Sequence, residues 1–306
     1  MPRRRHPASP RHGRHSLPLA ALACCCALLA ACTSGTADGS SGPARQEAAA
    51  TEPEPQAPTW NPNPRSVAAI GDSITRAFDA CSLLSDCPEA SWATGTDESV
   101  DSLARQLLGP EADLADRAWN LAESGATVAD LPAQAAAAAT HAPDLITILI
   151  GANDACADEV ADMTATADFR AAFTEALGII RELQPETEVY VASVPDLMHL
   201  WEEGSGSLMA RAVWRIADIC PTMLRNAGDR DEATAGRRAA VRERVEEYNA
   251  VLEEECGRDP LCRYDGGAVF EYPFTSRHIS DWDWFHPSRA GQSELAALAY
   301  ERITRD

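Results

Sequence analysis

Four short segments of the sequence carry side chains that could together perform nucleophilic catalysis. They read Gly71-Asp72-Ser73-Ile74-Thr75, Asn120-Leu121-Ala122-Glu123-Ser124-Gly125, Gly151-Ala152-Asn153-Asp154 and Asp283-Trp284-Phe285-His286-Pro287. A serine hydroxyl is a weak nucleophile at neutral pH, so it needs a base within hydrogen-bond reach to take its proton. Ser73 is the candidate nucleophile, His286 the candidate base and Asp283 the carboxylate that could orient the imidazole.

Each segment by itself also fits a purely structural role. Gly-Asp-Ser is a common turn sequence, and a serine that opens a helix is more often a cap than a nucleophile. Gly125 alone fits a turn, Asn153 a polar loop and His286 a packed ring. Asp281 is a rival to Asp283, since either carboxylate could lie near the imidazole. Only the combination of the four segments favours catalysis.

The elements that must position these segments alternate from residue 65 onward. Short apolar runs separate longer helical patterns, which is typical of βα units on a mainly parallel sheet. Ligands of such sheets bind at the carboxyl ends of the strands, and three of the four segments follow predicted strands. A helix is expected directly after Gly71, with the partial positive charge of its amino terminus beside Ser73. The other expected elements are strands at 67–70, 117–121, 145–150 and 188–193 and helices at 128–140, 168–183, 208–219, 231–256 and 287–303, the last with Pro287 in its first turn.

Taken in this order, the four segments resemble those of the SGNH hydrolases, also called GDSL esterases or lipases. The resemblance covers roughly residues 66–303 and implies a flavodoxin-like α/β fold, a three-layer α/β/α sandwich with a mainly parallel central sheet. It also implies an oxyanion hole made by the backbone N–H groups of Ser73 and Gly125 and the side-chain amide of Asn153. Ser73 lies outside any Gly-x-Ser-x-Gly sequence, which separates this chain from the α/β-hydrolases.

The reaction that this resemblance implies is hydrolysis of a carboxylic ester through an acyl-enzyme on Ser73. Side chains and water suffice for it, so we expect no cofactor and no metal ion. The substrate is open: the segment from Gly151 to Cys156 and the cysteines favour a lipase or phospholipase-like ester hydrolase, with a carbohydrate acetyl esterase as the alternative. A surface lipoprotein that binds an acyl group or glycan without cleaving it is the non-enzymatic alternative. The segment from Ala80 to Asp101, with Trp92, could wall an acyl pocket or be a stapled surface excursion.

The amino terminus has the layout of a bacterial export signal. An arginine-rich stretch precedes an apolar run over residues 17–31 that is too short to span a bilayer. The run ends in Leu29-Ala30-Ala31-Cys32, which resembles the lipobox of lipoproteins, where the cysteine is acylated. We therefore expect a signal peptide at 1–32 with lipidation of Cys32, a disordered linker at 33–64 and the hydrolase domain at 65–306. A secreted enzyme cut near the same place is the alternative.

Cysteine usage fits an exported protein. The chain has ten cysteines, of which four lie in the expected leader. The others are Cys81, Cys87, Cys156, Cys220, Cys256 and Cys262. An even number in an exported chain favours disulfides, although sequence alone allows many pairings. Cys81 with Cys87 and Cys256 with Cys262 would close short loops, which leaves Cys156 for Cys220. Zinc binding is the weaker alternative, because the spacings differ from those of zinc ligands.

Charge limits the class of partner. The formal net charge of −21 disfavours nucleic-acid binding, which depends on cationic contacts to phosphate. We expect a small-molecule or lipid ester as substrate, contact with the membrane only through the lipid anchor, and a monomer, either anchored to the outer face of the membrane or secreted. His141, His199 and His278 are scattered in sequence and are expected to be surface or packing residues.

Overall fold

The computed structural model describes residues 59–110 and 112–305. Within these residues, five strands form one parallel sheet in the order β2-β1-β3-β4-β5. The strands are β1 (Val67–Gly71), β2 (Ala118–Asn120), β3 (Leu145–Leu149), β4 (Glu188–Val191) and β5 (Cys262–Tyr264). β1 and β3 are buried along their whole length, as expected for apolar runs in the centre of a parallel sheet. The predicted mainly parallel α/β fold is confirmed.

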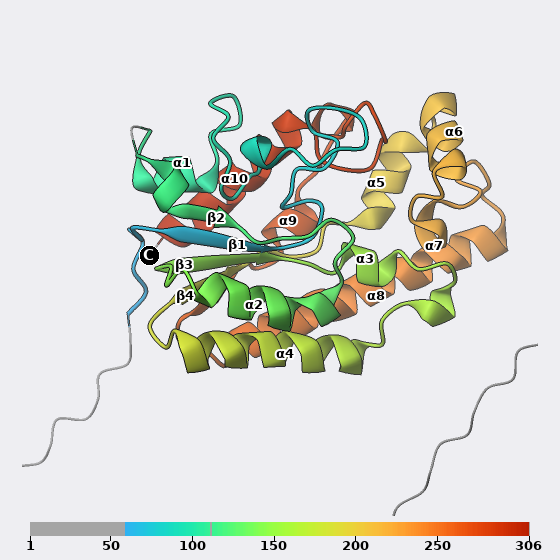
Figure 1. The fold of residues 1–306 in the computed structure, drawn as a ribbon. Coiled ribbons are helices and arrows are strands. Elements are labelled where there is room, and N and C mark those ends of the chain that lie inside the picture. The colour runs from blue at the N-terminus through green and yellow to red at the C-terminus, as the bar shows by residue number, and fades with distance from the viewer. Residues whose placement is uncertain (1–58, 111, 306) are drawn as a thin grey trace, which may run out of the picture. The chain divides into compact units, whose positions relative to one another are not determined.

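Helices cover both faces of this sheet. Figure 1 shows α2 (Leu131–Ala139), α4 (Thr166–Leu183) and α8 (Glu232–Cys256) on one face and α1 (Leu103–Leu108) and α10 (Arg289–Thr304) on the other. The shorter helices are α3 (Ala152–Ala155), α5 (Leu197–Gly204), α6 (Leu208–Ile216), α7 (Pro221–Leu224) and α9 (Ala268–Glu271). Single 3₁₀ turns lie at Pro88–Ala90, Leu114–Asp116, Val128–Asp130, Val160–Asp162 and Ser276–His278. This arrangement is the expected three-layer sandwich.

Most element boundaries differ from the sequence expectations by a few residues, and two of these differences have a visible cause. β4 ends at Val191 instead of residue 193, because the Ser193 N–H donates to the Asp265 side chain at 2.9 Å. α10 begins at Arg289 after the N-cap Ser288, so Pro287 lies outside the helix and pairs with Ile279 in an isolated antiparallel bridge. Both differences follow from side-chain and long-range pairings that periodicity does not reveal.

The sequence analysis did not predict β5. It has only the three residues Cys262–Tyr264, each half-buried, so it is too short to show an alternating pattern. It forms because Val189 to Val191 of β4 offer a free edge to it. The strand also follows the Cys256–Cys262 disulfide, which brings it back to the end of α8.

Three disulfides lie within the described part of the chain. They join Cys81 to Cys87, Cys156 to Cys220 and Cys256 to Cys262, so the expected pairings are confirmed. The first closes a loop near the site, the second joins the end of α3 to the start of α7, and the third closes the turn between α8 and β5. Disulfides of this kind are compatible with an oxidising, extracytoplasmic compartment.

The chain packs onto the sheet domain from Trp60 onward. The Trp60 indole N–H donates to the Ile303 carbonyl at 2.9 Å, and Arg263 lies over the Trp60 ring at 4.4 Å from its centroid. The expected leader, Cys32 and the linker up to residue 58 lie outside the described residues. Among the helices that are described, none is both long and apolar enough to cross a membrane.

Candidate active site

Ser73 lies in a tight turn directly after β1, at the carboxyl edge of the sheet. Gly71 ends the strand with φ +142°, and a Cβ at this position would lie 2.1 Å from the Leu149 carbonyl oxygen of β3. No side chain fits there, so glycine is required where the chain leaves the sheet. The turn places the Ser73 hydroxyl over the strand ends, with the side chain almost fully buried.

The helix expected directly after Gly71 is absent from the structure. Residues 73–79 form successive turns: the Ile74 N–H donates to Asp72 Oδ1 at 2.9 Å, and the Phe78 N–H reaches back to the Ser73 carbonyl at 3.0 Å. Ala77 has φ +50°, which lies outside the right-handed helical region and interrupts a helix. The expectation that a helix amino terminus places a partial positive charge beside Ser73 is therefore wrong.

A continuous chain of hydrogen bonds joins Ser73, His286 and Asp283. The Ser73 hydroxyl lies 2.8 Å from His286 Nε2, and His286 Nδ1 lies 2.5 Å from Asp283 Oδ2. Because a carboxylate only accepts, Nδ1 carries the proton and Nε2 is free to receive one from the serine. This is the arrangement needed to activate a serine hydroxyl.

The backbone next to His286 holds the carboxylate of Asp283. Asp283 Oδ1 accepts from the N–H groups of Phe285 at 2.8 Å and His286 at 3.0 Å, which aims Oδ2 at the imidazole. Burial favours the protonated acid, but the hydrogen bond from His286 and these N–H groups hold the pKa of Asp283 below its usual range. Asp281, the rival in the sequence, is exposed and makes no such contact.

The loop that carries Asp283 and His286 is fixed from two sides. Trp284 has φ +58°, and its carbonyl accepts from the buried indole N–H of Trp214 on α6 at 3.2 Å. The rings of Phe78 and Phe285 pack against the imidazole of His286 at centroid distances of 5.0 and 5.1 Å. These contacts limit the positions that the imidazole can adopt.

The three expected oxyanion donors follow β1, β2 and β3, with Asn153 in the short helix α3. Within residues 59–110 and 112–305, the backbone N–H groups of Ser73 and Gly125 donate to no other protein group. The Asn153 side-chain amide donates one N–H to the Ala126 carbonyl at 2.8 Å and has a second N–H to offer. Gly125 has φ +88°, which favours glycine at this exposed turn.

Three buried carboxyl groups surround the site, and sequence reasoning missed all of them. Asp72, Asp79 and Asp154 are each at most 2% exposed, and each has one side-chain oxygen without a hydrogen-bond partner. Burial raises the pKa of Asp72 to about 7 and that of Asp154 above its usual range. Burial and the neighbouring negative charge of Asp283 raise the pKa of Asp79. Their positions next to Ser73 and Asn153 are the only sequence signal that could have identified Asp72 and Asp154.

An apolar pocket opens beside His286. Its cavity volume is about 60 Å³. Besides Asp196 and the histidines His199, His278 and His286, the lining residues are Ile74, Ala152, Pro195, Leu197, Leu200, Tyr272, Phe274, Ile279, Phe285, Pro287 and Leu295. A pocket with this apolar lining is suited to an apolar ligand group.

Two of the scattered histidines stabilise a wall of this pocket. The Nε2–H of His199 donates to the Phe274 carbonyl at 2.6 Å, and His278 Nδ1 accepts from the Thr275 N–H at 3.0 Å. Both contacts fit packing roles. His141 lies elsewhere and stacks on Trp119 at a centroid distance of 4.6 Å.

The segment from Ala80 to Asp101 does not line this pocket. Trp92 is 1% exposed and belongs to the core, where its ring lies against Tyr190. Its backbone N–H donates to the side chain of Gln292 on α10 at 2.8 Å. The expectation that this segment forms a wall of an acyl pocket is therefore wrong for the pocket beside His286.

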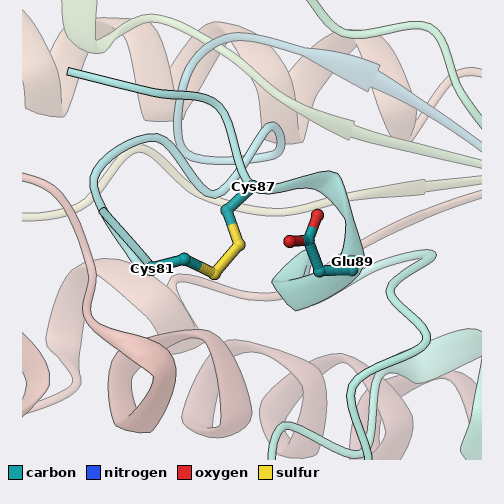
Figure 2. Close-up of side chains that lie close together, drawn as sticks. All are labelled: Cys81, Cys87 and Glu89. Atoms are coloured by element: carbon teal, nitrogen blue, oxygen red, sulfur yellow. A yellow bond between two sulfur atoms is a disulfide. The ribbon is translucent and has the colours of Figure 1, made fainter. Parts of the chain in front are cut away.

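One cluster in the described residues has the composition of a metal site. The ligand atoms of Cys81, Cys87 and Glu89 lie within 4.8 Å of one another. Figure 2 shows that the two sulfur atoms are joined in a disulfide beside the Glu89 carboxylate. A disulfide sulfur is not a thiolate, and thiolate is the form of cysteine that binds metals. The cluster therefore does not fit a metal site.

A sequence model of the GDSL-like Lipase/Acylhydrolase family matches residues 69–293, which include all four segments of the site. No curated protein matches the chain.

Solved structures from several bacteria are also similar to this chain. An extracellular lipase from Streptomyces rimosus is 20% identical, with a TM-score of 0.47 over 78% of this chain and 99% of the lipase. A phospholipase A1 from Streptomyces albidoflavus is 17% identical, with a TM-score of 0.48 over 79% of this chain and 100% of the phospholipase. A family 3 carbohydrate esterase from Clostridium thermocellum is 15% identical, with a TM-score of 0.45 over 78% of this chain and 94% of the esterase.

Proposed function

The chain belongs to the GDSL-like lipase/acylhydrolase family, and from this premise we propose that it is a serine esterase that hydrolyses carboxylic esters through an acyl-enzyme on Ser73. The observation that carries the proposal is the hydrogen-bond chain from the Ser73 hydroxyl through His286 to Asp283. A binding protein has no need of this chain, whereas acyl transfer depends on it.

The reaction begins when Ser73 Oγ attacks the ester carbonyl while His286 Nε2 takes the hydroxyl proton. Asp283 stabilises the resulting imidazolium and keeps the ring oriented. The same proton then goes to the leaving alcohol, which leaves an acyl group on Ser73. Water attacks this acyl-enzyme with His286 as base again, and the carboxylic acid departs.

The negative charge that develops on the carbonyl oxygen needs donors that are already in place. We assign the backbone N–H groups of Ser73 and Gly125 and the second side-chain N–H of Asn153 to this role. The bond from Asn153 to the Ala126 carbonyl fixes the amide plane and points its other N–H in a defined direction. The assignment is supported by the freedom of both backbone N–H groups.

The substrate that fits best is an ester with an aliphatic acyl chain longer than acetyl. The pocket beside His286 has apolar walls on several sides, and its nearest residues, Ile74 and Phe285, adjoin Ser73 and His286 in sequence. An acyl chain in this pocket would remove apolar surface from water, at about 25 cal/mol per Å² buried. An acetyl group would bury less of this apolar lining than a longer chain.

A fluorophosphonate probe tests the reaction class. We expect the probe to label the wild-type protein and to fail on Ser73→Ala and on His286→Ala, with circular dichroism showing that both variants are folded. Folded wild-type protein that stays unlabelled and hydrolyses no ester would support the binding alternative instead.

A series of nitrophenyl esters from acetate to palmitate tests the substrate class, with acetylated xylan and phospholipid beside it. We expect Leu200→Trp, which narrows the pocket, to move the preferred acyl length toward shorter chains. One methylene in an apolar pocket changes the rate by roughly 10- to 200-fold. Leu208→Trp is the matched control, since Leu208 is 78% exposed on α6 and lines no part of the pocket. Highest activity on acetylated xylan would favour a carbohydrate acetyl esterase.

A further inference from the structure

The loop closed by the Cys81–Cys87 disulfide contacts the loop that carries Gly125. We propose that Asp86, inside this disulfide loop, is a positioning residue that acts through Ser124 to hold the Gly125 N–H in place for the oxyanion, a role that rests on the proposed esterase function. Asp86 Oδ1 accepts from the Ser124 hydroxyl at 2.5 Å. Asp86 Oδ2 accepts from Arg76 Nε at 3.1 Å.

The Gly125 loop has few other contacts that could hold it. Glu123, Ser124 and Gly125 are all exposed, and nothing lies within 4 Å of where a Gly125 Cβ would be. The flanking residues are fixed: the Glu123 N–H donates to the Gly71 carbonyl at 3.1 Å, and the Ala126 carbonyl accepts from Asn153 at 2.8 Å. The Ala126 N–H also donates to the Glu123 carbonyl at 3.1 Å, which closes the turn. Within this turn, the bond from Ser124 to Asp86 is the one hydrogen bond that a side chain makes to another described residue.

Asp86 is itself held rigidly. It adjoins Cys87, whose N–H donates to the Arg76 carbonyl at 3.1 Å. The Asp79 N–H donates to the Ser85 carbonyl at 3.0 Å, and Asp79 Oδ1 accepts from the Leu84 N–H inside the same loop. With the disulfide, these bonds fix the loop from which Asp86 reaches Ser124.

The same segment also contacts the loop that carries Asp283 and His286. The Ser280 hydroxyl donates to the Asp79 carbonyl at 2.7 Å, and the Phe78 ring packs against His286. The chain from Arg76 to Cys87 therefore connects the Gly125 loop to the loop of Asp283 and His286. Through this connection, the segment around the Cys81–Cys87 disulfide positions groups for the reaction although it lines no part of the pocket beside His286.

Steady-state kinetics of full-length Asp86→Ala and Ser124→Ala with a nitrophenyl ester test the proposal. We expect each change to lower kcat about 10- to 100-fold, which is less than loss of a whole oxyanion donor, with KM little changed. The double variant should be no slower than the slower single variant, because both changes break the same bond. Ser124→Thr keeps the hydroxyl and should keep most of the activity.

Asp101→Asn is the matched control. Asp101 also forms an ion pair, with Arg105 at 3.6 Å, and lies on the same excursion, but it does not contact the Gly125 loop. We expect wild-type kcat from this variant. A general loss of folding would instead lower the melting temperature and the number of sites that a fluorophosphonate titrates, so kcat is expressed per titrated site.

A trifluoromethyl ketone separates positioning of the oxyanion donors from a structural effect. It forms a tetrahedral adduct with the nucleophile, so its Ki should rise in Asp86→Ala by the same factor as kcat/KM falls. Unchanged kcat and Ki in both single variants, or additive losses in the double variant, would overturn the role of Asp86. Wild-type protein that neither hydrolyses esters nor reacts with the fluorophosphonate would instead disprove the esterase function, and this proposal with it.

Discussion

The side-chain amide of Asn153 is the one proposed oxyanion donor that a single substitution can remove, because the other two donors are backbone N–H groups. Asn153→Ala leaves Ser73, His286 and Asp283 in place and deletes one N–H from the proposed oxyanion hole. We expect kcat to fall about 100- to 1,000-fold, as loss of one such donor does in other enzymes. The measurement is ester hydrolysis with Ser73→Ala as the background rate. An unchanged rate would show that Asn153 is not an oxyanion donor.

Asp283 and Asp281 offer a paired test of the orienting carboxylate. Asp283 Oδ2 contacts His286 Nδ1, whereas Asp281 is exposed. Asp283→Asn presents an amide that favours the wrong imidazole tautomer, so kcat should fall by about four orders of magnitude. Asp281→Asn should retain the wild-type rate. The opposite ranking of the two variants would assign the orienting role to Asp281.

The buried carboxyl of Asp72 predicts a pH dependence of stability. Its pKa is raised from 3.8 to about 7 by burial. Between these two values the folded protein retains a proton that the unfolded chain has lost, so this group makes stability fall as pH rises from about 4 to about 7. Asp72→Asn keeps an acceptor for the Ile74 N–H but cannot titrate. The change in the free energy of unfolding that this titration causes is at most about 4 kcal/mol.

Urea unfolding at pH 4.5 and pH 8 measures this effect. The free energy of unfolding should fall less between these pH values in Asp72→Asn than in the wild-type protein. Asp158→Asn, at an exposed position, is the control and should follow the wild-type protein. Equal pH dependence in all three proteins would mean that Asp72 is ionised throughout this range.

At the level of secondary-structure elements, the disulfides differ in how much of the chain they constrain. Cys156–Cys220 closes a loop with a sequence separation of 64, whereas Cys256–Cys262 has a separation of 6. Loop-closure entropy predicts stabilisation of about 4 kcal/mol for the long loop and about 2 kcal/mol for the short one. Replacing both cysteines of each pair by serine should therefore lower the melting temperature more at Cys156–Cys220. Equal losses would mean that native-state contacts, rather than chain entropy, dominate.

The walls of the apolar pocket come from elements that are far apart in sequence. α5 supplies Leu197 and Leu200, and the chain before the catalytic loop supplies Tyr272 and Phe274. The bond from His199 to the Phe274 carbonyl ties these two walls together. No local pattern in either segment indicates that the two segments contact each other. The pocket depends on how α5 packs beside the carboxyl end of the sheet.

At the scale of the whole molecule, the lipobox-like sequence predicts an anchored enzyme. Acylation of Cys32 would join the expected linker at 33–64, and through it the hydrolase domain, to the membrane. Cys32→Ala should move the protein from the detergent phase to the aqueous phase in a phase-separation assay, with ester hydrolysis unchanged. Wild-type protein found in the aqueous phase would support the secreted alternative.

The sequence by itself indicated the hydrolase family, the parallel sheet and the residues at its strand ends. Buried parallel strands have continuous apolar runs, and the residues after them must meet at one edge of the sheet, so Ser73, Gly125 and Asn153 could be grouped without coordinates. Loop length also favoured the Cys81–Cys87 and Cys256–Cys262 disulfides, whose cysteines are six positions apart. These features are local in the chain, and local patterns are what a sequence records directly.

Only the tertiary structure decided which carboxylate orients His286, that turns replace the helix after Gly71, and where the apolar pocket lies. It also revealed β5, the buried carboxyl of Asp72 and the contact between Asp86 and Ser124. Each of these depends on contacts between segments distant in sequence or on burial by such segments. The energies that select them arise only when the chain is folded.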